Sequence, residues 1–120
     1  MKRKKFKFED LEVWKISLDL SDMVYNLVDK LPAIENFNLK SQAIRSSTSI
    51  SLNIAEGSTG ASNSEQIRYL NIAIHSLIEF VACLRLIERR KYVEEMELYT
   101  IDDKLNTLFA KLNAFVRALR

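Results

Sequence analysis

Residues 98–119 read LYTIDDKLNTLFAKLNAFVRAL, and this stretch decides the fold. A leucine recurs in it every seven residues, and three more apolar side chains lie between the leucines: Ile101, Leu108 and Phe115. A strict seven-residue apolar repeat is typical of helices that pack side by side with a left-handed crossing of about 20°. The stretch therefore predicts one long bundle helix, over about residues 93–119.

The preceding segment repeats this pattern. Ile67, Ile74 and Val81 alternate with Leu70, Leu77 and Leu84. Ser62 and Glu65 form an S-x-x-E capping box, a signal for the start of a helix. A second long helix is therefore predicted over about residues 63–90.

The N-terminal part predicts a helix over about residues 10–31, which Pro32 ends because proline disfavours helical backbone at the residue before it. This helix has two apolar stripes. The first stripe holds Val13, Leu20, Val24, Leu27 and Leu31, and the second holds Leu11, Trp14, Leu18 and Tyr25. In the connection that follows, we expect Ile34 and Phe37 to cover the end of the bundle.

The remaining helix is predicted over about residues 39–56, with Gly57 as the left-handed residue that follows its last turn. Its apolar face is narrow and holds Ala43, Ser47, Ile50 and Ile54. Five serines and threonines within residues 46–51 give this segment low intrinsic helicity, so packing must hold it in the helix.

Short connections make successive helices antiparallel neighbours. The sequence therefore predicts an all-α fold, an up-down-up-down antiparallel four-helix bundle of left-handed packing over residues 9–120, with a basic tail over residues 1–8. Only two glycines and one proline occur in 120 residues, which argues against a sheet and its turns.

The net charge of +2 hides an asymmetry. Five cations stand in the first seven residues: Lys2, Arg3, Lys4, Lys5 and Lys7. The rest of the chain has 13 basic and 16 acidic residues and is mildly acidic. The tail could contact phosphates, or it could be a solvated terminus.

No secretory signal and no membrane-spanning apolar run can be read in the sequence. We therefore expect a cytoplasmic protein without membrane contact, with its one cysteine, Cys83, reduced.

Catalysis, metal binding and cofactors are not expected. One cysteine and one histidine cannot build a Cys/His zinc site, and no glycine-rich phosphate loop is present. His75, Glu79 and Cys83 follow one another at four-residue intervals along one helix side. They could be a nucleophile with a base or metal ligands, but chance alignment on a long helix, with Cys83 as a small core residue, is the favoured interpretation.

Two polar groups remain. Along one face of the second helix lie Gln42, Arg45, Ser49, Asn53 and Glu56, which could be solvated, bind a partner, or form a buried network that sets the helix register. Near the end of the third helix lie Arg85, Arg89, Arg90 and Lys91, which could complement the helix dipole or contact phosphates.

Residues 42–57, QAIRSSTSISLNIAEG, resemble the hallmark of a bacterial family of four-helix-bundle proteins. This family was first known from open reading frames in intervening sequences of 23S ribosomal RNA genes. The similarity extends over about residues 8–116, through the opening around Trp14, the connection Leu31-Pro32-x-x-Glu35, the third-helix run around Tyr69 and Ser76, and Tyr92. Asn38 and Lys40 depart from the family's usual Gly and Thr.

The resemblance implies a homopentamer with a central channel and no known catalysis. Relatives that accompany diversity-generating retroelements work beside a reverse transcriptase and bind nucleic acid. The resemblance also implies that a set of polar residues has a structural or subunit-contact role. The set consists of Gln42, Arg45, Ser49, Asn53, Glu56, Ser76 and Glu79. We expect Arg45 to pair with Glu56 or Glu79, within or between subunits.

The leading hypothesis is a non-enzymatic oligomer associated with RNA, or with DNA, through the basic tail and the Arg85–Lys91 cluster. The alternative is a scaffold that docks a protein partner such as a polymerase or a reverse transcriptase through an exposed apolar patch. An enzyme that uses His75, Glu79 or Cys83 is the third possibility.

Overall fold

The computed structural model describes residue 3 and residues 5–120. Two of the predicted tail cations, Lys2 and Lys4, lie outside the described residues. The described chain contains four long helices: α1 (Glu12–Val28), α2 (Leu39–Gly57), α3 (Asn63–Arg89) and α4 (Glu95–Leu119). Two short 3-10 helices precede α1 and α2: η1 (Lys7–Asp10) and η2 (Ala33–Glu35).

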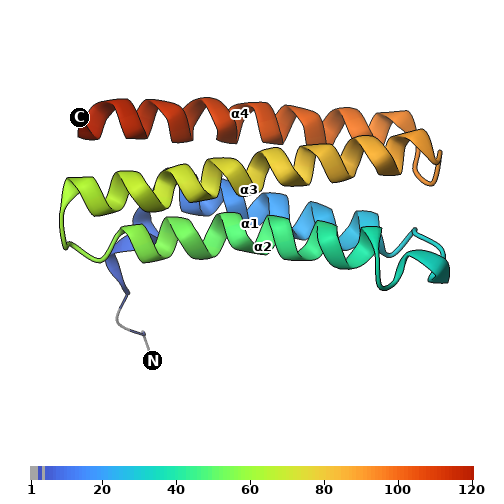
Figure 1. The fold of residues 1–120 in the computed structure, drawn as a ribbon, viewed down its shortest axis with the longest axis horizontal. Coiled ribbons are helices and arrows are strands. Elements are labelled where there is room, and N and C mark those ends of the chain that lie inside the picture. Colours follow the sequence, from blue (N-terminus) through green and yellow to red (C-terminus); the bar gives the residue numbers. More distant parts are fainter. Residues whose placement is uncertain (1–2, 4) are drawn as a thin grey trace.

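The four helices form one antiparallel bundle (Figure 1). Each helix packs against the next in the chain, and α4 closes the ring against α1. The start of α1 and the end of α4 therefore lie at one end of the bundle, with the α2–α3 turn, while the α1–α2 and α3–α4 connections lie at the other (Figure 1). The predicted all-α four-helix bundle is confirmed.

Each helix contributes a buried apolar stripe to one core. The largest fully buried side chains are Leu20 and Leu27 of α1, Ile50 and Ile54 of α2, Leu70, Leu77, Phe80, Leu84 and Ile87 of α3, and Ile101, Leu108 and Leu112 of α4. On α3 the predicted heptad is only half in the core, since Ile67, Ile74 and Val81 are partly exposed. The buried stripe instead combines the three leucines with Ala73, Phe80 and Ile87, each three residues after a leucine, so the seven-residue repeat holds with a different second position.

The second apolar stripe predicted for α1 is partly wrong. Leu18 and Tyr25 are exposed, whereas Leu11 and Trp14 pack against the core. The predicted cover at the end of the bundle is also wrong, because Ile34 is 83% exposed and Phe37 is 98% exposed. The buried residues there are Leu31, Glu35 and Leu39. An apolar residue in a short connection is therefore not enough to predict burial.

Two helix ends differ from the predicted bounds. α1 ends at Val28, because the amides of Lys30 and Leu31 bond carbonyls three residues back, at 3.1 Å each, and tighten the chain before Pro32. α4 begins at Glu95, because Lys91 takes a left-handed conformation with φ of 59° and ends α3.

The prediction that Gly57 is left-handed is wrong, since only Gly60 among the glycines has positive φ, at 87°. Gly57 is the last residue of α2, and a Cβ there would stand 2.9 Å from the Cβ of Tyr69 on α3. This position needs glycine because two helices approach closely, not because the backbone turns.

α3 is the one helix in the described part of the chain that is long and apolar enough to cross a membrane, and 44% of its most apolar window is buried in the bundle. A core helix meets the same criterion. Some of the apolar side chains of α3 are exposed, among them Ile78 and Leu86.

Candidate functional site

The polar face predicted on α2 lies along its boundary with α3. The Arg45 guanidinium bonds both carboxylate oxygens of Glu79, and this contact raises the pKa of Arg45. Arg45 thus pairs with one of its two expected partners, within a single chain. Glu56 and Gln42 are exposed, and the Gln42 amide donates to Asn38 at 3.4 Å.

The centre of this face is a small hydrogen-bonded network. The hydroxyls of Ser49 and Ser76 share a hydrogen bond of 2.8 Å between α2 and α3. The Asn53 amide donates to the Ser49 carbonyl at 2.8 Å and to its hydroxyl at 3.1 Å. Ser76 is buried, and Ser49 and Asn53 are half-buried. Of the three possibilities for this face, the structure favours an internal network that sets the register of α2 against α3. Its role in subunit contact stays a prediction.

The four cations of the second predicted cluster do not act together. Arg85 makes a bidentate pair with Asp102 of α4, at 2.9 and 3.2 Å, and also lies 3.6 Å from Glu88. Arg85 therefore ties α3 to α4. Arg89, Arg90 and Lys91 are exposed, but they stand between Glu88 on one side and Glu94 and Glu95 on the other. These three carboxylates equal the three cations in number, so residues 88–95 carry no excess positive charge.

The described tail cations lie at the opposite end of the bundle (Figure 1). Arg3, Lys5 and Lys7 are exposed, and only Lys5 makes an ion pair within residues 3 and 5–120, to Asp10 at 3.7 Å. Arg117 and Arg120, near the end of α4, are exposed at the same end. The structure therefore separates the two predicted nucleic-acid clusters by the length of the bundle and favours the tail end as the cationic one.

His75, Glu79 and Cys83 do not converge on one centre. His75 is exposed, whereas Cys83 is buried and its thiol donates to the Leu39 carbonyl at 3.5 Å. Burial, more than the nearby Glu79 carboxylate, raises the pKa of Cys83, which makes the thiol a poor nucleophile. Across the described residues, no three His, Cys, Asp or Glu side chains lie close enough to hold a metal ion.

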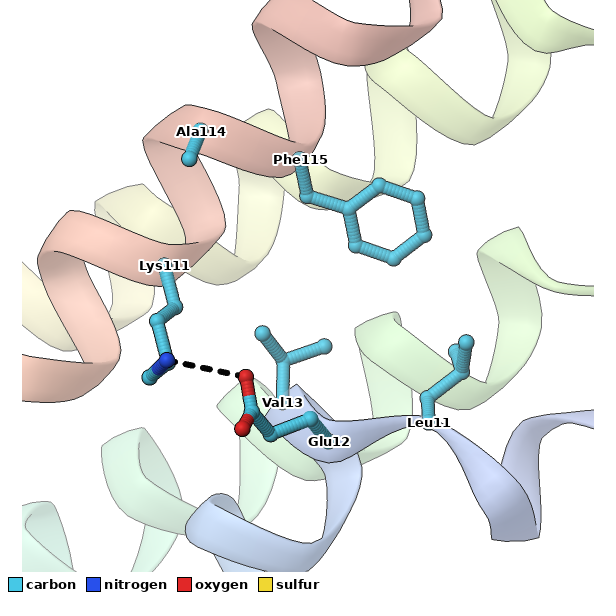
Figure 2. A pocket seen from close by; sticks show the side chains of 6 residues that line it. All are labelled: Leu11, Glu12, Val13, Lys111, Ala114 and Phe115. Carbon is cyan, nitrogen blue, oxygen red and sulfur yellow. Dashed lines mark ion pairs between the residues drawn. The ribbon is translucent and has the colours of Figure 1, made fainter.

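A pocket of about 410 Å³ lies between the first turn of α1 and the last turns of α4 (Figure 2). Its walls are Leu11, Val13, Ala114 and Phe115, and an ion pair of 2.9 Å between Lys111 and Glu12 closes one side. Most of the lining is apolar, and the two charged side chains in it are paired with each other. The pocket therefore suits an apolar side chain.

Sequence reasoning missed two arrangements. Tyr92 donates a hydrogen bond of 2.8 Å to Glu35, which is buried, and Glu35 also accepts from Asn38 at 3.3 Å. This bond joins the two connections at one end of the bundle and raises the pKa of Tyr92. The only sequence signal for it was that both residues belong to the family resemblance.

The second missed arrangement is a polar pocket at the other end. Lys7 borders it together with Ser58, Ser62, Asn63 and Gln66, at the turn that leads into α3. The capping box pointed to this place: Ser62 does accept the Glu65 amide at 3.0 Å, while the Glu65 carboxylate pairs with Arg68 instead of reaching back.

The chain is similar to known proteins over nearly all of this bundle. The model of the family described as "23S rRNA-intervening sequence protein" matches residues 9–114. A crystal structure from Bacteroides thetaiotaomicron, of a protein with unknown function from the S23 ribosomal protein family, has 28% identity to it and a TM-score of 0.80. That match covers 87% of this chain and 97% of the other. No curated protein matches the chain.

Proposed function

Because this chain belongs to the 23S rRNA-intervening sequence protein family, and a solved relative is described as a protein with unknown function, we propose its role from its surface: a non-catalytic, oligomeric protein that associates with RNA. The observation that carries the proposal is the unequal distribution of charge. Nucleic-acid affinity comes largely from cations that neutralise phosphates, so an uncompensated cationic surface is the feature to look for.

Cations on the sides of the bundle face carboxylates. Arg85 pairs with Asp102, Lys104 with Asp19, Lys111 with Glu12, and Arg45 with Glu79. These groups are already neutralised. At the tail end, Arg3, Lys7, Arg117 and Arg120 make no ion pair within the described residues. The tail end is therefore the surface we assign to RNA.

Association of several copies would multiply this charge. The face of α3 and α4 leaves Ile78 and Phe109 exposed beside a shallow groove, and exposed apolar patches of this kind commonly mark protein contacts. We assign this face to contact between copies, with the pentamer implied by the family resemblance as the expected state. The protein is expected in the cytoplasm.

The test is a titration against a structured RNA at two salt concentrations. We expect affinity to fall steeply with salt in the wild type. A variant with glutamine at positions 2, 3, 4, 5 and 7 should reduce the slope of log K against log salt by roughly 4, since each of the five phosphate contacts contributes about 0.7–0.9. The matched control is the triple variant Arg89→Gln, Arg90→Gln, Lys91→Gln at the opposite end, which should leave the slope nearly unchanged. Equal effects of both variants, or no binding near physiological salt, would refute the proposal.

A protein-docking scaffold remains the second candidate function, because of a specific observation at the other end. Ile34 and Phe37 are almost wholly exposed beside a network that holds their connection in place. An ordered connection with two exposed apolar side chains is suited to bind a partner protein. Binding of a protein that is insensitive to salt and lost in Phe37→Ser would favour this function.

A further inference from the structure

A small polar pocket lies where the N-terminal segment meets the start of α3. Its volume is about 140 Å³, and Lys7, Ser58, Ser62, Asn63 and Gln66 border it. Two glycines complete the wall, and no carboxylate takes part in it. A water molecule occupies about 30 Å³ of the liquid, so the pocket has room for one small oxyanion with water and not for a nucleoside.

The start of α3 directs hydrogen-bond donors to this place. The first amides of a helix have no acceptor within the helix, and here they stand at the positive end of a 27-residue helix. Ser62 satisfies the amide of Glu65 through its hydroxyl and that of Gln66 through its carbonyl, both at 3.0 Å. The amides of Asn63 and Ser64 make no hydrogen bond to any other described residue.

Ser58 provides a second, independent observation. The residue is only 7% exposed, and its hydroxyl is buried without a hydrogen-bond partner in the part of the chain that the structure describes. Among the described buried side-chain nitrogen and oxygen atoms it is the one left in this state. Buried hydroxyls nearly always have a partner, and Ser58 is one of the residues that line the pocket, so its orphaned hydroxyl points to a group that binds there.

The remaining features also suit an anion. Lys7 supplies a cation at the edge of the pocket and makes no ion pair within residues 3 and 5–120. Gly60 also lines the pocket, and a Cβ placed on it would meet no atom within 4 Å. Amides, hydroxyls and a lysine that converge at a helix start are the usual components of phosphate sites.

We propose that this pocket binds one phosphate group of the RNA backbone, through Lys7, the Ser58 hydroxyl and the free amide of Asn63. The phosphate source rests on the proposed function, whereas the oxyanion site itself rests on the pocket. It lies at the end of the bundle to which the tail cations belong, so it would place one phosphate where the other cations hold its neighbours.

The test is an amide-resolved NMR titration of the whole protein with inorganic phosphate, against sodium chloride at matched ionic strength. We expect the amide signals of Asn63 and Ser64 to move and saturate with phosphate alone. The amides of Leu39 and Lys40 are an internal control, because they begin another long helix, α2, whose first residue has no side-chain cap. Equal movement at both helix starts would overturn the site.

Two variants assign the side chains. Lys7→Gln and Ser58→Ala should each weaken phosphate binding at least about fivefold, as expected for lost hydrogen bonds to a charged group. Ser58→Ala should also leave the melting temperature unchanged or higher, because it removes a buried hydroxyl without a partner. A lower melting temperature with unchanged phosphate affinity would show that the hydroxyl is structural and would overturn the proposal.

The same proteins titrated with RNA separate the two proposals. If RNA binds and phosphate does not move the α3 amides, the pocket fails while the proposed function stands. If phosphate binds as expected and RNA does not bind, the pocket stands and its assignment to RNA fails.

Discussion

At the scale of single residues, the hydrogen bond from Tyr92 to Glu35 is the contact most open to a pH experiment. The carboxylate accepts the phenolic proton, which raises the pKa of Tyr92 above its ordinary value near 10. Because the folded-state pKa is the higher one, the bond stabilises the fold at all pH values below about 10 and is lost as pH rises through the folded pKa. We expect Tyr92→Phe to lower the melting temperature at neutral pH, and the difference from wild type to vanish at strongly alkaline pH.

The measurement is thermal unfolding of both proteins from pH 7 upward, with ultraviolet titration of tyrosinate beside it. The titration curve of wild type minus that of Tyr92→Phe isolates the transition of Tyr92. Tyr25→Phe, at an exposed position, is the control and should leave the melting temperature nearly unchanged. A Tyr92 transition below pH 10 would contradict the predicted shift.

Lys91 offers a second test at this scale. Its φ of 59° costs a side chain with a Cβ roughly 1 kcal/mol, and glycine adopts this conformation freely. We therefore expect Lys91→Gly to raise the free energy of unfolding by about 0.5–1 kcal/mol, measured by urea denaturation. Arg90→Gly is the matched control, because Arg90 has a helical φ of −79°, and it should lower stability by about the same amount.

The periodicity of the sequence predicts neither the hydrogen bond between Tyr92 and Glu35 nor the left-handed conformation of Lys91. Glu35 is a charged residue in a short connection, and such residues are normally exposed. Its burial depends on Tyr92, which lies 57 positions away in the chain. The sequence predicts a left-handed conformation at Gly57, but the structure has it at Gly60 and Lys91. Gly57 is needed for the close approach of α2 to α3, which sequence spacing does not reveal.

At the scale of elements, the close approach of α2 and α3 depends on Gly57. An added Cβ would meet the Cβ of Tyr69 at 2.9 Å and the Gln66 carbonyl at 3.4 Å. Alanine is about 1 kcal/mol better than glycine in a helix, but overpacking costs about 1–3 kcal/mol and the Tyr69 Cβ cannot rotate away. We expect Gly57→Ala to lower the free energy of unfolding in urea denaturation.

The control for this prediction is Gly60→Asn. Asparagine tolerates the left-handed backbone, and a Cβ at Gly60 meets no atom within 4 Å, so this variant should be nearly neutral. If Gly57→Ala stabilises the protein instead, helix propensity outweighs the contact and the close approach is not limiting.

The four helices can be predicted from the sequence because each of them buries a continuous stripe of apolar or small side chains. Ala43, Ser47, Ile50 and Ile54 of α2 are all buried, although the serines there are poor helix formers. Packing thus overrides propensity in α2. Leu18 and Tyr25 show the limit of such predictions. Both are apolar and lie beside the buried stripe of α1, but no other helix in the described part of the chain covers them, so they are exposed.

At the scale of the whole molecule, charge and apolar surface are segregated in a way that the linear sequence conceals. The two basic clusters look like one system when only their composition is considered. In the bundle they lie at opposite ends, and one of them has three carboxylates within residues 88–95. Composition could predict that a basic segment exists, but only the antiparallel topology decides which cations share a surface.

The exposed apolar side chains of α3 and α4 lead to the last prediction. Ile78 and Phe109 are exposed and line a groove together with Val81 and Leu105, and nothing in the fold of one chain requires them to be apolar. If copies associate through this face, light scattering should give a mass several times 13.9 kDa, about 70 kDa for the closed ring of five. Ile78→Asp should reduce the mass toward that of a single chain, since it places a charge within the apolar contact without touching the core.

Arg45→Glu, on the polar α2–α3 face, is the matched variant for the other candidate interface, which the family resemblance implies. Loss of mass in Arg45→Glu with an intact Ile78→Asp oligomer would move the subunit contact to that polar face, and a wild-type mass of 13.9 kDa would exclude both.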